Sequence, residues 1–267
     1  MAFYGCDFKF NSFSCSNMGL MMYDFGSTSQ DEESEFTSFG SIVSDTVAGR
    51  DGIFLYGEEI KDTLTPRIIF GIGYRRLKEN KWLTRDEVAK VAEWLTSDGK
   101  WGWLSIKQED MVEYRYKVVL SSLKLLHNGD YPYAFDAEFT ADSPYAYTRP
   151  MSFLWKPGKN IFNNSSSNKG YYRPLLRISL PSGGGYFSII NFSDNGREFK
   201  FSKLPQSVKA IEVDNENQII TDLNNGLNLY EYFNYNFFRA VKGKNDIRII
   251  GDGIVHAYCE FPVNIGV

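Results

Sequence analysis

The sequence predicts a mainly β protein made of two modules: an N-terminal β-rich domain with one α-helix packed on its sheet, and a C-terminal antiparallel β-sandwich. Only residues 84–97 have helical periodicity, while short strand-like segments punctuated by turn residues fill most of the rest. Residues 151–170 are rich in turn residues, which predicts a linker between modules 1–150 and 171–267. Charge divides similarly: residues 1–156 carry 17 Lys+Arg against 23 Asp+Glu, net -6, and residues 157–267 carry 12 against 10, net +2.

Composition indicates a globular protein. At 267 residues the chain is long enough for two medium domains of about 100–200 residues each. Its 17 Tyr and 21 Phe suit strands, and a net charge of -4 argues against a general nucleic-acid binder. Cys6, Cys15 and Cys259 lack metal-ligand spacing, so we expect free thiols in a reducing cytosol. Neither a signal peptide nor an apolar span of ~18 residues is evident, so no membrane insertion is expected.

The N-terminal segments read as short strands. Residues 3–25 predict two strands joined by a turn at residues 14–17. The acidic stretch after them, with Asp31-Glu32-Glu33 and then Glu35, predicts a solvated loop rather than a cation site. Residues 36–60 then predict a hairpin, with a turn where Gly49 and Gly52 flank Arg50-Asp51. No Lys-Ser/Thr pair follows these glycines, which excludes a phosphate-cradling loop.

The predicted helix follows a strand at residues 66–74, which places Ile68, Phe70, Ile72 and Tyr74 on one face. Thr84 and Glu87 have the spacing of a capping box, and Asp98-Gly99 ends the helix. Its apolar stripe consists of Val88, Val91, Ala92 and Leu95. Because a lone helix of about three turns is marginal in water, the stripe must lie on a sheet.

The remaining strands of the first half are expected at residues 101–107, 113–120 and 133–140. Asn128-Gly129 is the strongest hairpin signal in the chain. In the second half, apolar alternation between turn residues predicts strands at 176–180, 186–192, 198–201, 208–213, 218–220, 237–241, 246–250 and 254–261. Short strands at ~8–12-residue spacing without a helix are typical of an all-β sandwich.

Catalytic chemistry has little support. The two histidines, His127 and His256, lie far in sequence from any cysteine or serine elbow, and no nucleophile-elbow, zinc-protease or P-loop motif is present. Paired carboxylates for glycoside hydrolysis stay open among 33 acids, which leaves an enzyme as the weakest alternative. We therefore expect no catalytic residue, no metal and no cofactor.

Sugar binding is the more serious alternative, since such sites often stack a Trp ring on the sugar. All five tryptophans precede residue 157, however. The aromatic and Asn-rich run 224–236 is the best candidate for a recognition or docking loop, against the plainer interpretation of an inter-strand connection. Its candidate residues are Tyr230, Tyr232, Asn234 and Tyr235.

The succession of segments resembles the distal tail protein of phages with long, non-contractile tails, over nearly the whole chain. In the first half the resemblance depends on V-A-G-R-D-G at 47–52, V-A-E-W-L at 91–95 and F-T-A-D-S-P-Y at 139–145. In the second half it depends on R-P-L-L-R-I at 173–178, I-E-V-D-N-E-N at 211–217 and V-K-G-K-N-D-I-R-I-I-G at 241–251. The acidic stretch within 26–46 and the run 224–236 depart from the pattern.

The resemblance implies a structural virion protein at the phage tail tip, assembled in the host cytoplasm. Family members form hexameric rings between the tail tube protein and the tail-associated hub protein, and receptor-binding proteins dock on this scaffold. The implied C-terminal domain is a galectin-like sandwich, and DNA is only passing cargo. From the residues themselves we expect the 36–60 hairpin to supply the oligomer interface, through Phe36, Phe39, Ile42 and Val43. A carbohydrate-binding module of a host-adhesion device is the alternative.

Overall fold

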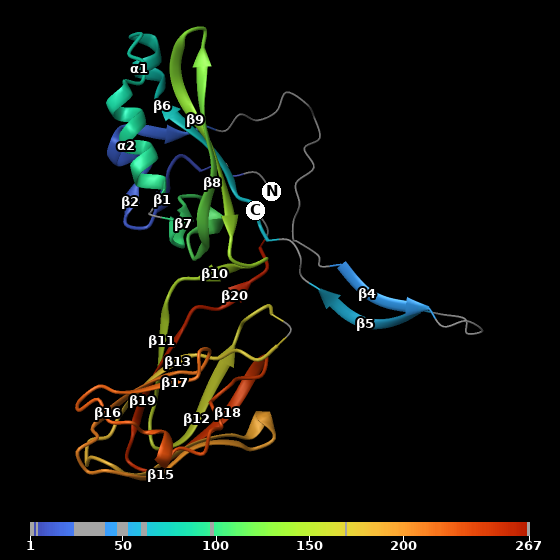
Figure 1. The fold of residues 1–267 in the computed structure, drawn as a ribbon, viewed down its shortest axis with the longest axis vertical. Coiled ribbons are helices and arrows are strands. Elements are labelled where there is room, and N and C mark those ends of the chain that lie inside the picture. The colour runs from blue at the N-terminus through green and yellow to red at the C-terminus, as the bar shows by residue number, and fades with distance from the viewer. Residues whose placement is uncertain are drawn as a thin grey trace. The chain divides into compact units, whose positions relative to one another are not determined.

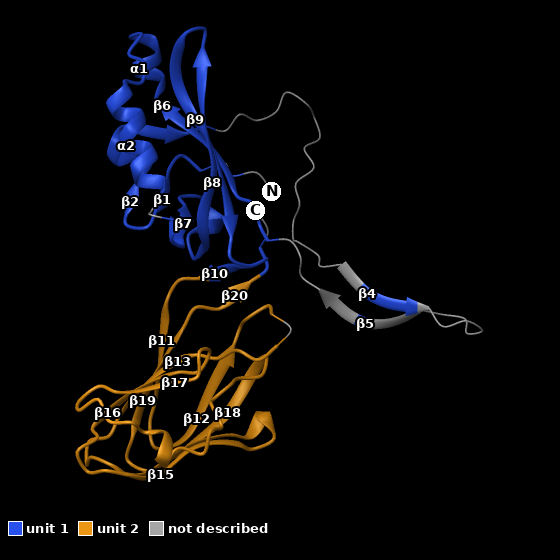
Figure 2. Cartoon of the chain, viewed as in Figure 1, with its two compact units in different colours: residues 1–147, 264–267 blue, residues 148–263 orange. Residues whose placement is uncertain are grey.

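The structure is a computed structural model of the 267-residue chain. It describes residue 3 and residues 5–23, 41–46, 53–59, 63–96, 99–168 and 170–265. The chain divides into two compact units, unit 1 (Met1–Tyr147 with Asn264–Val267) and unit 2 (Thr148–Val263), coloured blue and orange in Figure 2. Strands dominate both units, so the predicted mainly β fold is confirmed.

Unit 1 is built on one antiparallel sheet with the strand order β2-β1-β7-β8-β9-β6-β3 (Figure 1). Its strands are β1 (Phe8–Phe10), β2 (Phe13–Ser14), β3 (Leu20–Met22), β6 (Arg67–Ile72), β7 (Gly102–Ile106), β8 (Tyr114–Asn128) and β9 (Tyr131–Ala141). Strand β10 (Ala146–Thr148) joins the same sheet by pairing with β8. The other elements are the pair β4 (Ser41–Thr46) and β5 (Ile53–Glu59) and the 3-10 turns η1 (Cys15–Met18) and η3 (Glu109–Met111).

This sheet curls so that its two ends meet. Strands β1 and β6 are far apart in the strand order, yet the rings of Phe8 and Phe70 lie 5.0 Å apart, edge to face. The backbone N–H of Met22 in β3 donates to the carbonyl of Cys6, just before β1, at 3.1 Å. The curled sheet therefore surrounds an aromatic core, whose fully buried members are Phe8, Phe10, Phe70, Tyr116, Phe135 and Phe139.

Helix α2 (Arg85–Thr96) covers this core, as its apolar stripe predicts. Val91 and Leu95 are fully buried. The Trp94 ring stacks on Phe8 at 5.3 Å, and its Nε1 donates to the carbonyl of Phe10 at 3.3 Å. The predicted capping box is present, because Glu87 Oε2 accepts from the Thr84 N–H at 2.8 Å and Thr84 Oγ1 accepts from the Glu87 N–H at 3.3 Å.

A second, five-residue helix, α1 (Tyr74–Lys78), precedes α2. The prediction that the strand continues to Tyr74 was wrong: β6 ends at Ile72, and Tyr74 is 77% exposed at the start of α1. The strand ends there because the chain turns at Gly73, so the side chain of Tyr74 does not reach the core. Arg76 then ties α1 to α2 through Glu87, with Nη1 2.9 Å from Oε1.

Strands β8 and β9 form the long hairpin of unit 1. Their register closes at Asn128↔Tyr131, where the sequence predicts a turn, and Gly129 has a φ of +61°. A register shift near Ser121 marks a bulge, at which the Ser121 hydroxyl donates to the carbonyl of Glu138 at 2.9 Å. The predicted hairpin is therefore confirmed, and it is longer than the two expected strands.

Unit 2 is a sandwich of two antiparallel sheets with strand orders β11-β19-β13-β16-β17 and β12-β18-β14-β15. Its strands are β11 (Met151–Trp155), β12 (Gly158–Asn164), β13 (Leu175–Ser179), β14 (Gly185–Asn191), β15 (Arg197–Leu204), β16 (Ala210–Asp214), β17 (Ile219–Asp222), β18 (Gly243–Ile250) and β19 (Ile254–Cys259), with β20 (Pro262–Val263) after them. Short 3-10 turns lie at η4 (Phe192–Asp194) and η5 (Tyr230–Tyr232).

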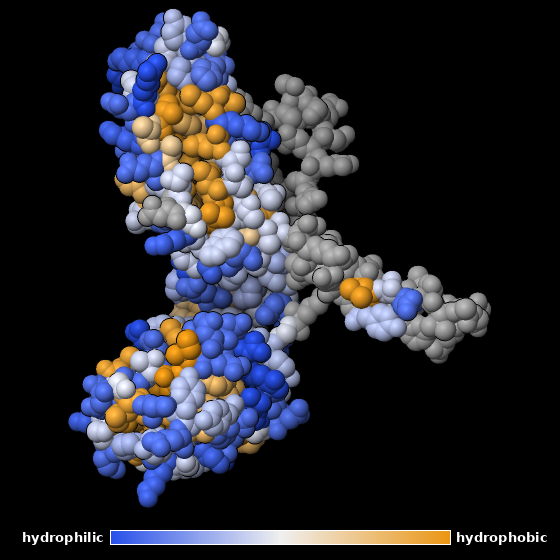
Figure 3. All heavy atoms as spheres, viewed as in Figure 1, coloured by the Kyte–Doolittle hydropathy of each residue, from blue (hydrophilic) through white to orange (hydrophobic). Residues whose placement is uncertain are grey.

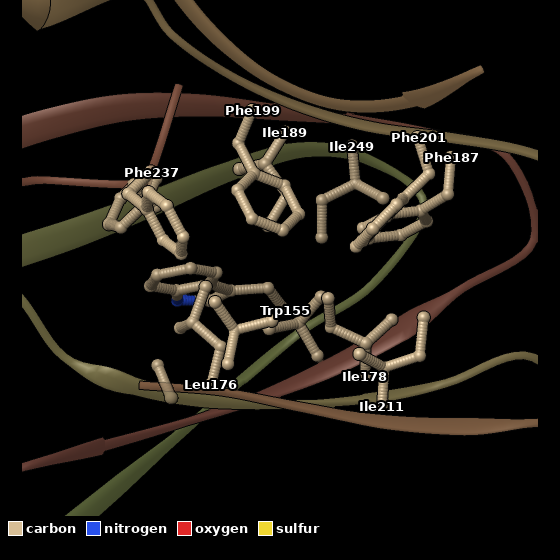
Figure 4. Close-up of a cluster of buried hydrophobic side chains, with 14 of the residues drawn as sticks. Trp155, Leu176, Ile178, Phe187, Ile189, Phe199, Phe201, Ile211, Phe237 and Ile249 are labelled. Carbon is tan, nitrogen blue, oxygen red and sulfur yellow. The ribbon is translucent and has the colours of Figure 1, made fainter. Parts of the chain in front are cut away.

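One core fills the space between the two sheets. Figure 4 shows Ile189, Phe199 and Ile249 of the four-stranded sheet facing Leu176 and Ile178 of the five-stranded sheet. The side chain of Trp155 lies among them and is 2% exposed. The strict alternation of buried and exposed residues along β13 and β18 follows from this one-sided burial.

Two expectations for the second half were wrong. Residues 151–170 were expected to be a linker, but they contain β11 and β12, whose inward-facing Trp155 and Phe162 belong to the core. Residues 237–241 were expected to be a strand, but this segment makes only an isolated bridge, Tyr172↔Ala240. Side-chain amides bind its backbone instead; Asn215 Oδ1, for example, accepts from the Phe238 N–H at 2.8 Å.

Candidate functional site

The candidate oligomer interface falls partly on the β4–β5 pair. Phe36 and Phe39 lie outside the described residues, and so does the side chain of Ile42, whose backbone pairs with Glu58. Val43 pairs with Gly57 and is 42% exposed. Within the described ranges β4 and β5 form a sheet of two strands only. Since an isolated two-stranded sheet is marginally stable in water, this hairpin needs further contacts to persist.

A second open surface is the outer edge of β8. Strand β7 pairs with β8 only from Tyr116 to Val118, whereas β9 stays paired with β8 as far as Asn128. Strand β7 thus gives residues 119–128 no ladder partner, and the other pairing of β8 is with the short strand β10. Half-buried Leu123 and Leu125 lie along this stretch, and Figure 3 shows apolar side chains over β8 and β9. Such an edge can accept another strand.

The candidate recognition loop is held by internal hydrogen bonds. The Tyr230 hydroxyl donates to the Gln218 carbonyl at 2.8 Å and accepts from the Ile220 N–H at 3.1 Å. The Asn234 side chain bonds to β15, with Nδ2 donating to the Glu198 carbonyl at 2.8 Å. Tyr232 is half-buried against the core. Tyr235 projects outward, 65% exposed with a φ of +58°.

These contacts give the four loop residues different chemistry. Tyr230 and Asn234 already use their polar atoms to position the loop, so they have little left with which to bind a partner. Tyr235 keeps an exposed ring, 6.2 Å from the ring of Tyr230 and tilted by 29° to it. The docking role of the loop stays a prediction, and Tyr235 is its best-presented side chain.

The tryptophans do not form a sugar-stacking platform. Trp155 is in the core of unit 2, Trp94 stacks on Phe8, and Trp82 stacks on Tyr131 at 5.2 Å. The Arg115 guanidinium lies 3.6 Å from the centre of the Trp103 ring. Trp101 is 51% exposed. Carbohydrate binding therefore stays an untested alternative, with one exposed tryptophan available to it.

Two surface hollows accompany these features. One, of 680 Å³, lies between η1 and α2 in unit 1, with apolar lining from Phe13, Met18, Leu20, Val91 and Trp94. The other, of 450 Å³, lies on the five-stranded sheet of unit 2, where Arg173, Arg177 and Tyr258 meet Asp214 and Glu216. Arg177 Nε is 2.7 Å from Glu212 Oε2, so part of this polar lining is already paired.

The reactive side chains are scattered. His127 is exposed near the tip of the β8–β9 hairpin in unit 1, and His256 lies on β19 of unit 2. Burial raises the pKa of the Cys15 thiol to about 12 and does the same for Cys259, so neither is a ready nucleophile. In the described ranges no three His, Cys, Asp or Glu side chains gather as a metal site. None of the helices described is long and apolar enough to cross a membrane.

Comparison with known proteins identifies the family. A family model described as "phage tail protein N-terminal domain" matches residues 3–143, and one described as "phage tail C-terminal domain" matches residues 145–259. The chain belongs to this family of phage tail proteins. No curated protein matches its sequence.

The fold of this phage tail protein is similar to that of a solved structure, the Dit (gp 19.1) protein of phage SPP1. That protein is described as a paradigm of the hub adsorption apparatus in phages that infect Gram-positive bacteria. The similarity has a TM-score of 0.67 at 10% identity and covers 96% of this chain and 98% of the Dit chain. The predicted resemblance to distal tail proteins is therefore confirmed at the level of family and fold.

Sequence reasoning missed two surfaces of this phage tail protein. The open edge of β8 was not noticed, although the run L-S-S-L-K-L-L at 120–126 carries more leucine than a solvent-facing strand needs. The outer face of β12 was missed because the whole segment was interpreted as a linker. Both surfaces depend on which strands become neighbours, and the sequence pattern of one strand does not contain that information.

Proposed function

We propose that this chain is a structural ring component of the distal tail tip, which joins the tail tube to the hub used in host adsorption. The observation that carries the proposal is the match of the full chain, across both units, to the Dit fold. Members of a cyclic ring must each present two different surfaces, so that every copy contacts the next one head to tail. The β4–β5 pair and the β8 edge are the surfaces that suit this role.

The two-stranded hairpin is the first contact in the proposed ring. Its backbone edges are unpaired in the described ranges, and Val43 and Tyr56 are exposed, Tyr56 by 68%. Adding a strand from a neighbouring copy would satisfy the backbone groups and bury both side chains. We propose that Phe36, Phe39, Ile42 and Val43 contribute to the contact with the neighbouring copy, with six copies closing the ring.

Charge supports a central channel in the proposed ring. Residues 1–156 carry a net charge of -6. An acidic lumen limits the sticking of DNA phosphates, so DNA can pass as cargo. In this account the neighbours of the ring are the tail tube protein, the tail-associated hub protein and receptor-binding proteins. The role is architectural rather than enzymatic, and assembly takes place in the host cytoplasm.

The experiment that tests the proposal is light scattering coupled to size-exclusion chromatography on the full chain. We expect a stable oligomer, with a mass near six chains. Replacing Ile42 and Val43 by lysine should give a folded monomer, because buried lysines oppose strand addition. The matched control is Leu154→Lys with Ile219→Lys, two exposed apolar residues of the sandwich (50% and 52%), which should leave the oligomer intact. An oligomer that persists in the Ile42/Val43 variant would contradict the assigned interface.

A further inference from the structure

The outer face of the four-stranded sheet in unit 2 has an unusual make-up. Because Phe162, Ile247 and Ile249 point into the core, the residues between them point outward. Register places Lys159 of β12 directly opposite Arg248 of β18, and Arg248 opposite Ile190 of β14. Two cations thus stand side by side in the middle of a sheet face.

No carboxylate of the described residues forms an ion pair with either of these two cations. The acids of the same face already have lysine partners: Asp246 is 3.5 Å from Lys244, and Glu198 is 3.5 Å from Lys200. Lys159 and Arg248 are exposed and form no ion pair in the part of the chain described. Like charges directly opposite each other destabilise a sheet, so a carboxylate brought by a partner would relieve a repulsion as well as form new pairs.

Exposed apolar side chains accompany the two cations. Ile161 is 60% exposed, Phe192 55% and Ile250 39%. A hollow of 370 Å³ brings Phe192 together with the two cations; its lining is Lys159, Phe192, Asp246, Ile247 and Arg248. Large exposed apolar residues gathered beside polar or charged ones mark an interaction surface. The fitting partner is a segment that carries both carboxylates and large apolar side chains.

The chain itself contains one segment with that composition. The run D-E-E-S-E-F-T-S-F at residues 31–39, which lies outside the described residues, has four acids and two phenylalanines. We propose that this outer face docks residues 31–39 of a second copy of the chain. The inference relies on the proposed ring, in which a head-to-tail contact supplies each copy with one segment and one face. It also gives a role to the acidic stretch that departs from the family pattern.

The test uses a synthetic peptide of residues 25–40 carrying a fluorescent label, with fluorescence anisotropy as the readout. The receptor is the full chain with Asp31→Asn, Glu32→Gln, Glu33→Gln and Glu35→Gln, so that its own segment does not compete. We expect saturable binding that weakens as salt is raised, because the attraction is partly between exposed charges. Adding Lys159→Glu and Arg248→Glu to the receptor should weaken binding by about tenfold or more.

The controls distinguish binding to the assigned face from non-specific attraction between charges, and the docking face from the proposed ring. Lys209→Glu with Lys242→Glu reverses two exposed lysines that lie outside the four strands of this sheet and should leave peptide binding unchanged. A peptide with its four acids replaced by amides should lose binding. Absence of binding by the acidic peptide, or equal binding to the Lys159/Arg248 variant, would overturn the proposal. Peptide binding by the receptor, together with a monomeric mass of the unsubstituted full chain in light scattering, would instead support the docking face and contradict the ring.

Discussion

Asn191 Nδ2 donates a hydrogen bond to Asn245 Oδ1 at 2.9 Å, between two side chains that are 1% and 0% exposed. Asn245 Oδ1 also accepts from the Val241 N–H at 2.9 Å, and Asn191 Nδ2 donates to the Arg239 carbonyl at 3.0 Å. The pair thus gives the non-strand segment 239–241 the hydrogen bonds that a sheet ladder would otherwise provide. Buried amides can serve in this way because each supplies both donors and acceptors.

We expect Asn245→Ala to destabilise unit 2 by about 3 kcal/mol, because it leaves the Val241 N–H and an Asn191 donor buried without partners. Urea unfolding followed by near-ultraviolet circular dichroism measures the change. Asn163→Ala is the matched control, since Asn163 is an exposed asparagine on neighbouring β12 and should cost less than about 0.5 kcal/mol. Equal losses of unfolding free energy in the two variants would show that the buried pair contributes no more than an exposed asparagine.

The ion pair between Asp194 and Arg239 should contribute more than an exposed pair of the same chemistry. The Asp194 side chain is 2% exposed and lies 2.7 Å from Arg239 Nε. Arg239→Ala would leave a carboxylate buried without its partner, and we expect a loss of about 3 kcal/mol. Arg177→Ala breaks the more exposed pair with Glu212, also 2.7 Å long, and should cost less than about 1 kcal/mol. A larger loss of stability in Arg177→Ala than in Arg239→Ala, measured by thermal unfolding, would refute this interpretation.

Acid should destabilise unit 1 through Asp136. The Arg67 hydrogen bonds hold the pKa of the Asp136 carboxyl below its ordinary value, although partial burial opposes this shift. Because the folded-state pKa is lowered, the stabilisation is complete above the unfolded pKa of about 3.9 and is lost as pH falls through the lower folded value. Arg67→Gln should therefore reduce the difference in urea midpoint between pH 7 and pH 3. An unchanged difference would exclude Asp136 as a contributor to the acid sensitivity.

The contribution of the capping box to the stability of α2 should be measurable by itself. Thr84→Ala removes the acceptor for the Glu87 N–H, and we expect it to cost about 1 kcal/mol. Thr84→Ser keeps the hydroxyl and should restore most of the loss. Amide hydrogen exchange in the first turn of α2 is the readout, because fraying there speeds exchange before the whole unit unfolds. Equal exchange in both variants would contradict the role of the hydroxyl.

Local patterns predicted several elements correctly. The capping box and the i, i+3, i+4 stripe of α2 depend on residues within one helix, and the Asn128-Gly129 turn depends on two adjacent residues. These signals are strong because the interactions behind them are local. The family resemblance depended on the order of the segments along the chain, and no single motif contains that order.

The errors came from residues whose role is set by distant partners. Strand β12 reads G-K-N-I-F-N-N, and only Phe162 among its core-facing residues is apolar, so its alternation was not visible. Asn164 faces inward too, where its amide donates to the Val241 carbonyl at 3.1 Å. In the candidate loop, the polar groups of Asn234 and Tyr230 hydrogen-bond to backbone groups of neighbouring segments. A sequence shows the polar atoms of these residues but not the partners that satisfy them.

The central claim is that this phage tail protein works by being repeated around an axis. Electron microscopy of the purified full chain tests it most directly. The account predicts closed rings with a central opening and about six equal subunits, of the cyclic symmetry usual for homo-oligomers. A field of single two-lobed particles at every protein concentration would contradict it.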